Sequence, residues 1–171
     1  MSLSVTNFDD YSVKKIVQFE GMEGAGFNCD LYRGTKKVAF CRDNGNGGDV
    51  TVRWSDKTEE ELLLTHVASL PPIPFDYGGG LKKDLKIDEG WFVSDLVAKR
   101  GMEKELKKLR KKCEKATLYR IPNKHRTNEY TEWPVIYSDK ARASIVAKYP
   151  DAEIFNDVLA KGQIPSVLME Y

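Results

Sequence analysis

The fold is decided by residues 27–54, which read FNCDLYRGTKKVAFCRDNGNGGDVTVRW. Apolar and polar side chains alternate from Phe27 to Tyr32 and again from Val50 to Trp54, and this period of two is typical of strands with one buried face. Between them, the run from Asn44 to Gly48 predicts a hairpin, because Asn-Gly pairs adopt positive φ at little cost. A further strand is expected before this stretch, over residues 13–19. Together, these segments predict a four-stranded antiparallel meander over residues 13–54.

Helices are predicted to pack on this sheet. Ser55 or Asp56 is expected to cap a helix over residues 55–70, which a proline-rich stretch ends. The following segment, residues 71–93, has no clear periodicity and is expected to be an irregular loop, of a length that is often functional. A long basic helix is then predicted over residues 94–116.

The predicted helix over residues 94–116 begins at Ser94 as its N-cap and has one narrow apolar face. Val93 and Val97 do not continue that face, and Gly101 lies where the phase changes, so a kink or break is expected there. The pattern leaves open whether this face packs on the protein's own sheet or on a second copy in a homodimer. We call it the apolar seam, and its members are Met102, Leu106, Leu109, Cys113 and Ala116.

The last part of the chain, residues 117–171, is predicted to contain a strand pair and short C-terminal helices. The strands are expected over residues 117–121 and 133–137, where β-branched and aromatic side chains are frequent. The helices are expected over residues 139–148 and 151–160, because a proline follows the first and a glycine the second.

Length and composition fit one cytoplasmic domain. A chain of 171 residues has the usual size of a single domain, so residues 1–171 are predicted to form one α+β domain. No apolar run approaches the ~18 residues that a membrane helix requires, and the start of the chain is unlike a secretory signal. Three cysteines without a C-x-x-C pair favour a reducing cytosol over a disulfide framework or a zinc site. We therefore expect a cytoplasmic protein with no membrane contact.

Positive charge is concentrated in the long helix. The chain has 27 basic and 26 acidic residues, yet residues 99–126 contain 12 basic and 3 acidic ones. Opposite the apolar seam, lysines recur on one helical face, and further cations flank it. Such a face can contact the phosphates of a nucleic acid or an acidic protein surface, whereas the alternative is an ordinary solvated helix face. We call this set the basic stripe, and it comprises Lys104, Lys107, Lys108, Arg110, Lys111 and Lys115.

The function predicted from these features is that of a non-enzymatic binding protein. Its partner is expected to be a nucleic acid or an acidic protein that meets the basic stripe. No aromatic residue interleaves with the lysines of the helix, which argues against single-strand binding by base stacking. No cofactor, metal ligand or catalytic residue is assigned, because neither His66 nor His125 belongs to a known signature with a cysteine or a serine.

An alternative is a metal-dependent nuclease. Asp76 follows a proline, and Asp84 and Lys86 follow it, an order that resembles the P-D…(D/E)-x-K pattern in which acids bind Mg²⁺ and a lysine positions water. That pattern places the first aspartate at the end of a strand, and a segment with three nearby prolines does not predict one. The match also arises easily by chance in a charged chain.

A second alternative is a binder of a small anionic nucleotide. Residues 78–80 are three glycines followed by two lysines two positions later, and backbone amides of such a loop can surround an anion. The sequence lacks both G-x-x-x-x-G-K-[ST] and a G-x-G-x-x-G that opens a helix, so a plain flexible loop is the simpler interpretation.

The glycine-rich stretches carry a resemblance that covers most of the chain. Several stretches resemble small uncharacterised proteins of bacteriophages and other mobile elements. They are the run from Phe19 to Asn28, the pair Leu31-Tyr32, the segments Lys36 to Ala39 and Asn44 to Gly48, the stretch Cys113 to Arg120 and the triplet Ile154 to Asn156. The resemblance brings no assigned activity and no catalytic residues. It implies an accessory protein in a bacterial cytosol, with inhibition of a host defence as one role.

Overall fold

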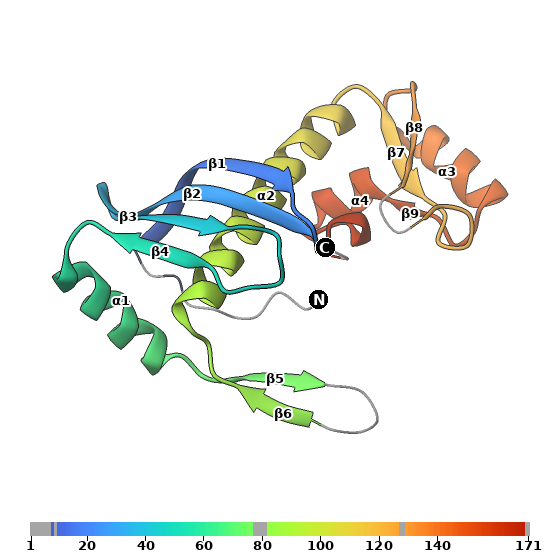
Figure 1. Ribbon diagram of the computed structural model, residues 1–171. Helices are drawn as coiled ribbons and strands as arrows, with labels where there is room; N and C mark the ends of the chain where they lie inside the picture. The colour runs from blue at the N-terminus through green and yellow to red at the C-terminus, as the bar shows by residue number, and fades with distance from the viewer. Residues whose placement is uncertain (1–7, 9, 77–81, 127–128, 170–171) are drawn as a thin grey trace. The chain divides into compact units, whose positions relative to one another are not determined.

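The computed structural model has an α+β fold, which confirms the predicted class (Figure 1). The chain divides into two compact units, an N-terminal unit that ends at Arg100 and a C-terminal unit that begins at Gly101. The single domain expected for residues 1–171 remains a prediction. The structure describes residues 8, 10–76, 82–126 and 129–169.

The N-terminal unit contains the predicted meander, which is confirmed. Its four strands lie in chain order, and each is antiparallel to the next. On β2 the alternation works as expected, because Cys29 and Leu31 are buried in the core. The strands are β1 (Tyr11–Glu20), β2 (Ala25–Arg33), β3 (Lys36–Asp43) and β4 (Thr51–Trp54).

Helical side chains complete the core of this unit. Helix α1 (Lys57–Ser69) contributes Leu63 and Val67, and the first half of helix α2 (Glu89–Cys113) contributes four apolar residues. The apolar positions of each helix recur at three and four residues, so each buries a single stripe against the sheet. The contribution of α2 consists of Phe92, Val93, Leu96 and Val97.

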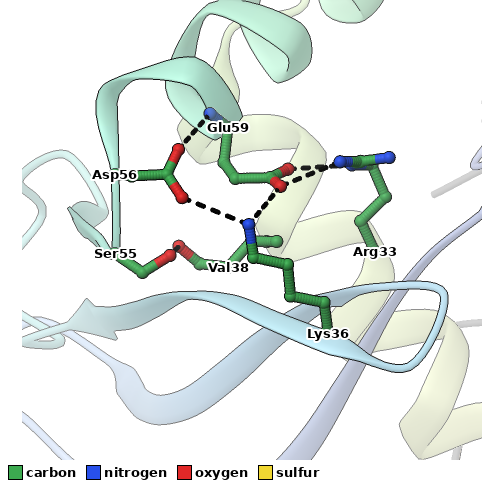
Figure 2. A network of polar contacts seen from close by, with 6 residues as sticks. All are labelled: Arg33, Lys36, Val38, Ser55, Asp56 and Glu59. Atoms are coloured by element: carbon green, nitrogen blue, oxygen red, sulfur yellow. Dashed lines mark hydrogen bonds and ion pairs between the residues drawn. The ribbon is translucent and has the colours of Figure 1, made fainter.

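Helix α1 begins at one of the two residues expected to cap it. Asp56 is the N-cap, and its side chain accepts a hydrogen bond from the backbone N–H of Glu59 at 3.0 Å. Glu59 is only 3% exposed and receives Arg33 and Lys36 from the β2–β3 hairpin (Figure 2). These partners hold the pKa of Glu59 at about 2, because hydrogen bonds from Arg33 and Lys36 favour the carboxylate. The network therefore fastens the start of α1 to the sheet.

The two glycine-rich turns of the meander pack backbone against backbone. The N–H of Glu23 donates to the carbonyl of Gly45 at 2.8 Å, which joins the β1–β2 turn to the β3–β4 turn. A Cβ on Gly45 would lie 2.6 Å from the carbonyl oxygen of Gly24, and Gly45 itself has a φ of +66°. Glycine is required here by close approach and by left-handed backbone. These residues of the resemblance are therefore explained by turn packing.

The prediction of an irregular loop over residues 71–93 is wrong. Strands β5 (Ile73–Asp76) and β6 (Lys82–Leu85) pair antiparallel as a two-stranded sheet, with Pro74 opposite Asp84. Proline is tolerated because each strand of a two-stranded sheet has a free edge where no N–H is needed. The prolines therefore did not exclude a strand.

Helix α2 starts earlier than expected and does not break. Asp88 caps it, since its side chain accepts a hydrogen bond from the N–H of Trp91 at 2.7 Å, and Ser94 lies inside the helix. The helix ends at Cys113 and continues through Gly101, so the predicted break there is wrong. A single glycine costs a helix only about 1 kcal/mol, which the flanking turns compensate. The change of phase instead marks the point where α2 passes from one core to the other.

The C-terminal unit combines a small sheet with short helices. Strand β7 pairs with β8 on one side and β9 on the other, all antiparallel. The helix expected over residues 151–160 begins only at Phe155, because the residues before it pair with β7 as a third strand that the sequence did not predict. The elements are β7 (Thr117–Arg120), β8 (Thr131–Trp133), α3 (Asp139–Lys148), β9 (Glu153–Ile154), α4 (Phe155–Ala160) and a 3-10 helix (Ser166–Leu168).

The apolar seam packs inside this unit. Leu109 and Ala116 are buried with Leu118 of β7 and Phe155 of α4, while the rest of the seam lies against the same cluster. This answers the question of what the seam faces, because it has a partner within its own chain. A homodimer remains a prediction that does not depend on the seam.

Candidate nucleic-acid interface

The basic stripe lies on the second half of α2 and in the turn that follows it. Because the apolar seam is held in the core, the residues opposite to it are turned to solvent. All six members of the stripe are exposed. Five of them lie within α2, and Lys115 follows its last residue.

Most of these cations have no acidic partner. Lys108 donates to the carboxylate of Glu105 at 2.5 Å, in a pair whose side chains are both about half exposed. Such a surface pair contributes little and opens readily, at a cost of about 0.5 kcal/mol. Within the described ranges, the remaining five members form no ion pair.

Lys112 differs from its neighbours on the helix. Its ammonium donates to the hydroxyl of Tyr130 at 3.0 Å and to Glu132 at 2.9 Å. These two contacts, the one with Tyr130 first, raise the pKa of Lys112 above its ordinary value. Lys112 thus joins α2 to β8 and, unlike the members of the stripe, has two partners within its own unit.

The whole C-terminal unit is positively charged. Residues 101–171 contain 14 basic and 10 acidic residues, for a net charge of +4, and within residues 101–126 the numbers are 10 and 3. Several acidic residues that the structure describes have partners outside the stripe, for example Asp157 with Arg142 and Glu153 with Ser166. The potential of this unit therefore favours an anionic partner.

The structure also assembles aromatic rings with cations that the sequence keeps apart. Tyr119 of β7 and Tyr149, which follows α3, stack with ring centroids 6.1 Å apart. The ammonium groups of Lys124 and Lys148 lie 4.8 and 5.3 Å from the centroid of the Tyr149 ring. These rings come from elements other than α2, so the lysines of α2 give no sign of them in the sequence.

The three residues of the nuclease alternative lie on β5, on β6 and directly after β6. Asp76 ends β5, so the objection that no strand would precede it is wrong. Asp84 and Lys86 are exposed. In the part of the chain that the structure describes, no three acidic, histidine or cysteine side chains gather as a metal site. The position of Asp76 at the end of a strand thus fits the nuclease pattern better than expected. Among the described residues, no observation favours Mg²⁺ binding.

The remaining candidates carry little chemistry. Residues 78–80, the proposed anion loop, fall outside the described residues. His66 packs against the rings of Tyr11 and Phe92 in the core of the N-terminal unit. His125 accepts a hydrogen bond from the N–H of Ile121 at 2.8 Å through Nδ1, and its Nε2 lies 3.0 Å from the hydroxyl of Thr131. Both histidines therefore have structural roles.

The cysteines are free thiols. Cys29 and Cys41 face each other across β2 and β3 and are fully buried, and Cys113 is half-buried in the seam. Burial raises the pKa of Cys113 to about 11, which leaves it a poor nucleophile.

Comparison with known proteins finds no matching family model, no curated relative and no similar solved structure. Among the described residues, no helix is both long and apolar enough to cross a membrane. A function has to be argued from the geometry of the chain itself.

Proposed function

We propose that this protein is a non-enzymatic nucleic-acid-binding protein whose contact surface is the basic stripe of α2. The observation that carries the proposal is that all six members of the stripe are exposed while only Lys108 is paired within the described residues. Cations without acidic partners release counterions from phosphates on binding, and this release drives association.

The composition of the stripe fits a phosphate backbone. Five of its six members are lysines, which bind phosphates as point charges without a fixed geometry. Along α2, the stripe extends from Lys104 to Lys111, about 10 Å at 1.5 Å per residue, and Lys115 lies in the turn after the helix. A surface of this length can contact more than one phosphate of a strand. Binding through it depends little on base sequence.

The biological setting is proposed from the resemblance alone. An accessory protein of a bacteriophage or another mobile element would work in the cytosol of a host bacterium. Binding of nucleic acid is compatible with inhibition of a host defence, and engagement of an acidic host protein is the competing outcome.

Charge reversal tests the proposal. The double variant Lys108→Glu, Lys111→Glu should weaken binding of a labelled oligonucleotide by more than about tenfold at ~100 mM salt, measured by fluorescence anisotropy. The matched control is Lys140→Glu, Lys161→Glu, which changes the charge of the same unit equally at two exposed lysines outside the stripe. Thermal melting should show both variants folded.

The outcomes separate the explanations. Equal weakening by both double variants would mean that net charge alone matters, and unchanged binding by the stripe variant would remove the stripe from consideration. Pull-down from bacterial lysate with and without nuclease treatment distinguishes a nucleic acid from an acidic protein partner, because only the first is lost on digestion.

A further inference from the structure

The pair Tyr119 and Tyr149 differs from the other tyrosines of the C-terminal unit. Tyr137 donates its hydroxyl to Asp157, and Tyr130 accepts a hydrogen bond from Lys112, so both have polar anchors. Within the described part of the chain, neither Tyr119 nor Tyr149 makes a hydrogen bond through its hydroxyl. Neither hydroxyl is among the buried polar atoms of the described residues that lack a partner, so both are open to solvent.

The two rings are held in place but not enclosed. Tyr119 is fixed by β7, the central strand of its sheet, and Tyr149 by the end of α3. Both side chains are half-buried, and the rings stack with an angle of 25° between their planes. Rings fixed in this way lose little freedom when a further planar group stacks on them.

Two exposed lysines complete the arrangement. The ammonium groups of Lys124 and Lys148 lie over the Tyr149 ring, and both side chains belong to exposed residues. A lysine over a ring at an exposed site is held weakly, and base–aromatic stacking is the stronger interaction. A nucleobase can therefore displace a lysine, which then remains close enough to neutralise the adjacent phosphate.

We propose that Tyr119 and Tyr149 form a stacking site for an unpaired nucleobase, with Lys124 and Lys148 contacting the flanking phosphates. The inference rests on the proposed function and specifies its ligand as single-stranded nucleic acid. A duplex hides the faces of its bases, so only an unpaired base can reach the rings. DNA and RNA share this chemistry.

The experiment compares ligands that differ only in their bases. The full-length protein is titrated with labelled oligothymidylate, with an oligomer of equal length made of abasic sugar phosphates, and with a duplex; oligouridylate distinguishes RNA from DNA. Wild-type protein should bind oligothymidylate at least about fivefold more tightly than the abasic oligomer, as expected for one stacked base at about 1–3 kcal/mol. This comparison needs no variant and so does not depend on folding of a mutant.

Variants then locate the site. Tyr149→Leu should remove the preference for bases while leaving abasic binding within about twofold, and Tyr149→Phe should keep the preference because the ring remains. The matched control is Tyr32→Leu, since Tyr32 of the N-terminal unit also carries a lysine over its ring, Lys14 at 4.0 Å, but is not stacked with a second tyrosine.

The results separate this inference from the function on which it rests. Equal wild-type affinity for the thymidylate and abasic oligomers would overturn the stacking site and leave the phosphate-binding stripe intact. A base preference that survives Tyr149→Leu would also overturn the site. Absence of binding to every oligomer would overturn the proposed function itself.

Discussion

Arg33 and Glu59 form a bidentate ion pair in which Nε and Nη2 of the guanidinium each donate to one carboxylate oxygen at 2.8 Å (Figure 2). The carboxylate is buried, whereas the arginine side chain is 38% exposed. The pair connects β2 to the first turn of α1, and Lys36 adds a second cation from β3. These contacts fix the first turn of the helix against the sheet of the N-terminal unit.

Replacing Glu59 by Gln should destabilise this unit. The neutral amide leaves Arg33 without a counter-charge and removes one of the two acidic partners of Lys36, which keeps Asp56 at 3.2 Å, so the free energy of unfolding should fall by about 2 kcal/mol. Urea denaturation measures the difference. Glu61→Gln is the matched control, because Glu61 is exposed on the same helix, and it should change stability by less than about 0.5 kcal/mol.

The same pair predicts how stability depends on acid. Arg33 and Lys36 lower the pKa of Glu59 from the ordinary 4.5 to about 2, so its contribution is complete above pH 4.5 and disappears as the pH falls toward 2. The stability difference between wild type and Glu59→Gln should therefore shrink below pH 4.5. A difference that stays constant down to pH 2 would contradict the assignment of the shift to this carboxylate.

Replacing Gly45 by Ala should be costly although the residue lies in a surface turn. Its φ of +66° disfavours any side chain, and the new Cβ would meet the carbonyl of Gly24. We expect a loss of about 2 kcal/mol, of which the left-handed conformation supplies about 1–2 kcal/mol. Gly48→Ala is the control, since nothing lies within 4 Å of a Cβ there. Similar losses in both variants would contradict the packing of the two turns.

Asn156 should be essential to the C-terminal unit. Its side-chain oxygen accepts from the N–H of Leu118 at 3.0 Å, and its amide donates to the carbonyls of Cys113 and Ala116 at 3.1 and 3.2 Å. Asn156→Ala leaves three half-buried backbone groups unsatisfied and should cost about 3 kcal/mol, seen as a lower melting temperature. The exposed Asn123 provides the control variant Asn123→Ala, which should melt as wild type.

Local patterns predicted the meander and the bounds of α3 well, whereas α2 and α4 begin at other residues than expected and β8 lies at 131–133 instead of 133–137. Contacts between distant segments are the part that the sequence could not supply. Alternation and Asn-Gly turns mark β2 and β3 directly, and Ser138 and Pro150 delimit α3. The pairing of Pro74 with Asp84 was missed because a proline excludes a strand only where its N–H is needed. The apolar pattern changes phase at Gly101. A continuous helix that packs into two cores gives the same pattern as a helix that breaks, so the pattern alone does not distinguish them.

The candidate site divides in the same way. The basic stripe could be predicted because it repeats along one helix, and its exposure follows from the burial of the seam. The stack of Tyr119 on Tyr149 could not, because the two residues are joined only through the folding of β7 and α3. The triplet Ile154 to Asn156, which is part of the resemblance, is explained only by the structure. There the side chain of Asn156 links α2 to β7.

The measurement that tests the central claim most directly is the salt dependence of oligonucleotide binding by the wild-type protein. If the stripe neutralises phosphates, the logarithm of the association constant should fall linearly with the logarithm of salt concentration between about 50 and 300 mM, with a slope of about −3 to −4 for a single strand. The variant Lys108→Glu, Lys111→Glu should flatten that slope. A slope near zero, or a slope that the variant leaves unchanged, would contradict the account.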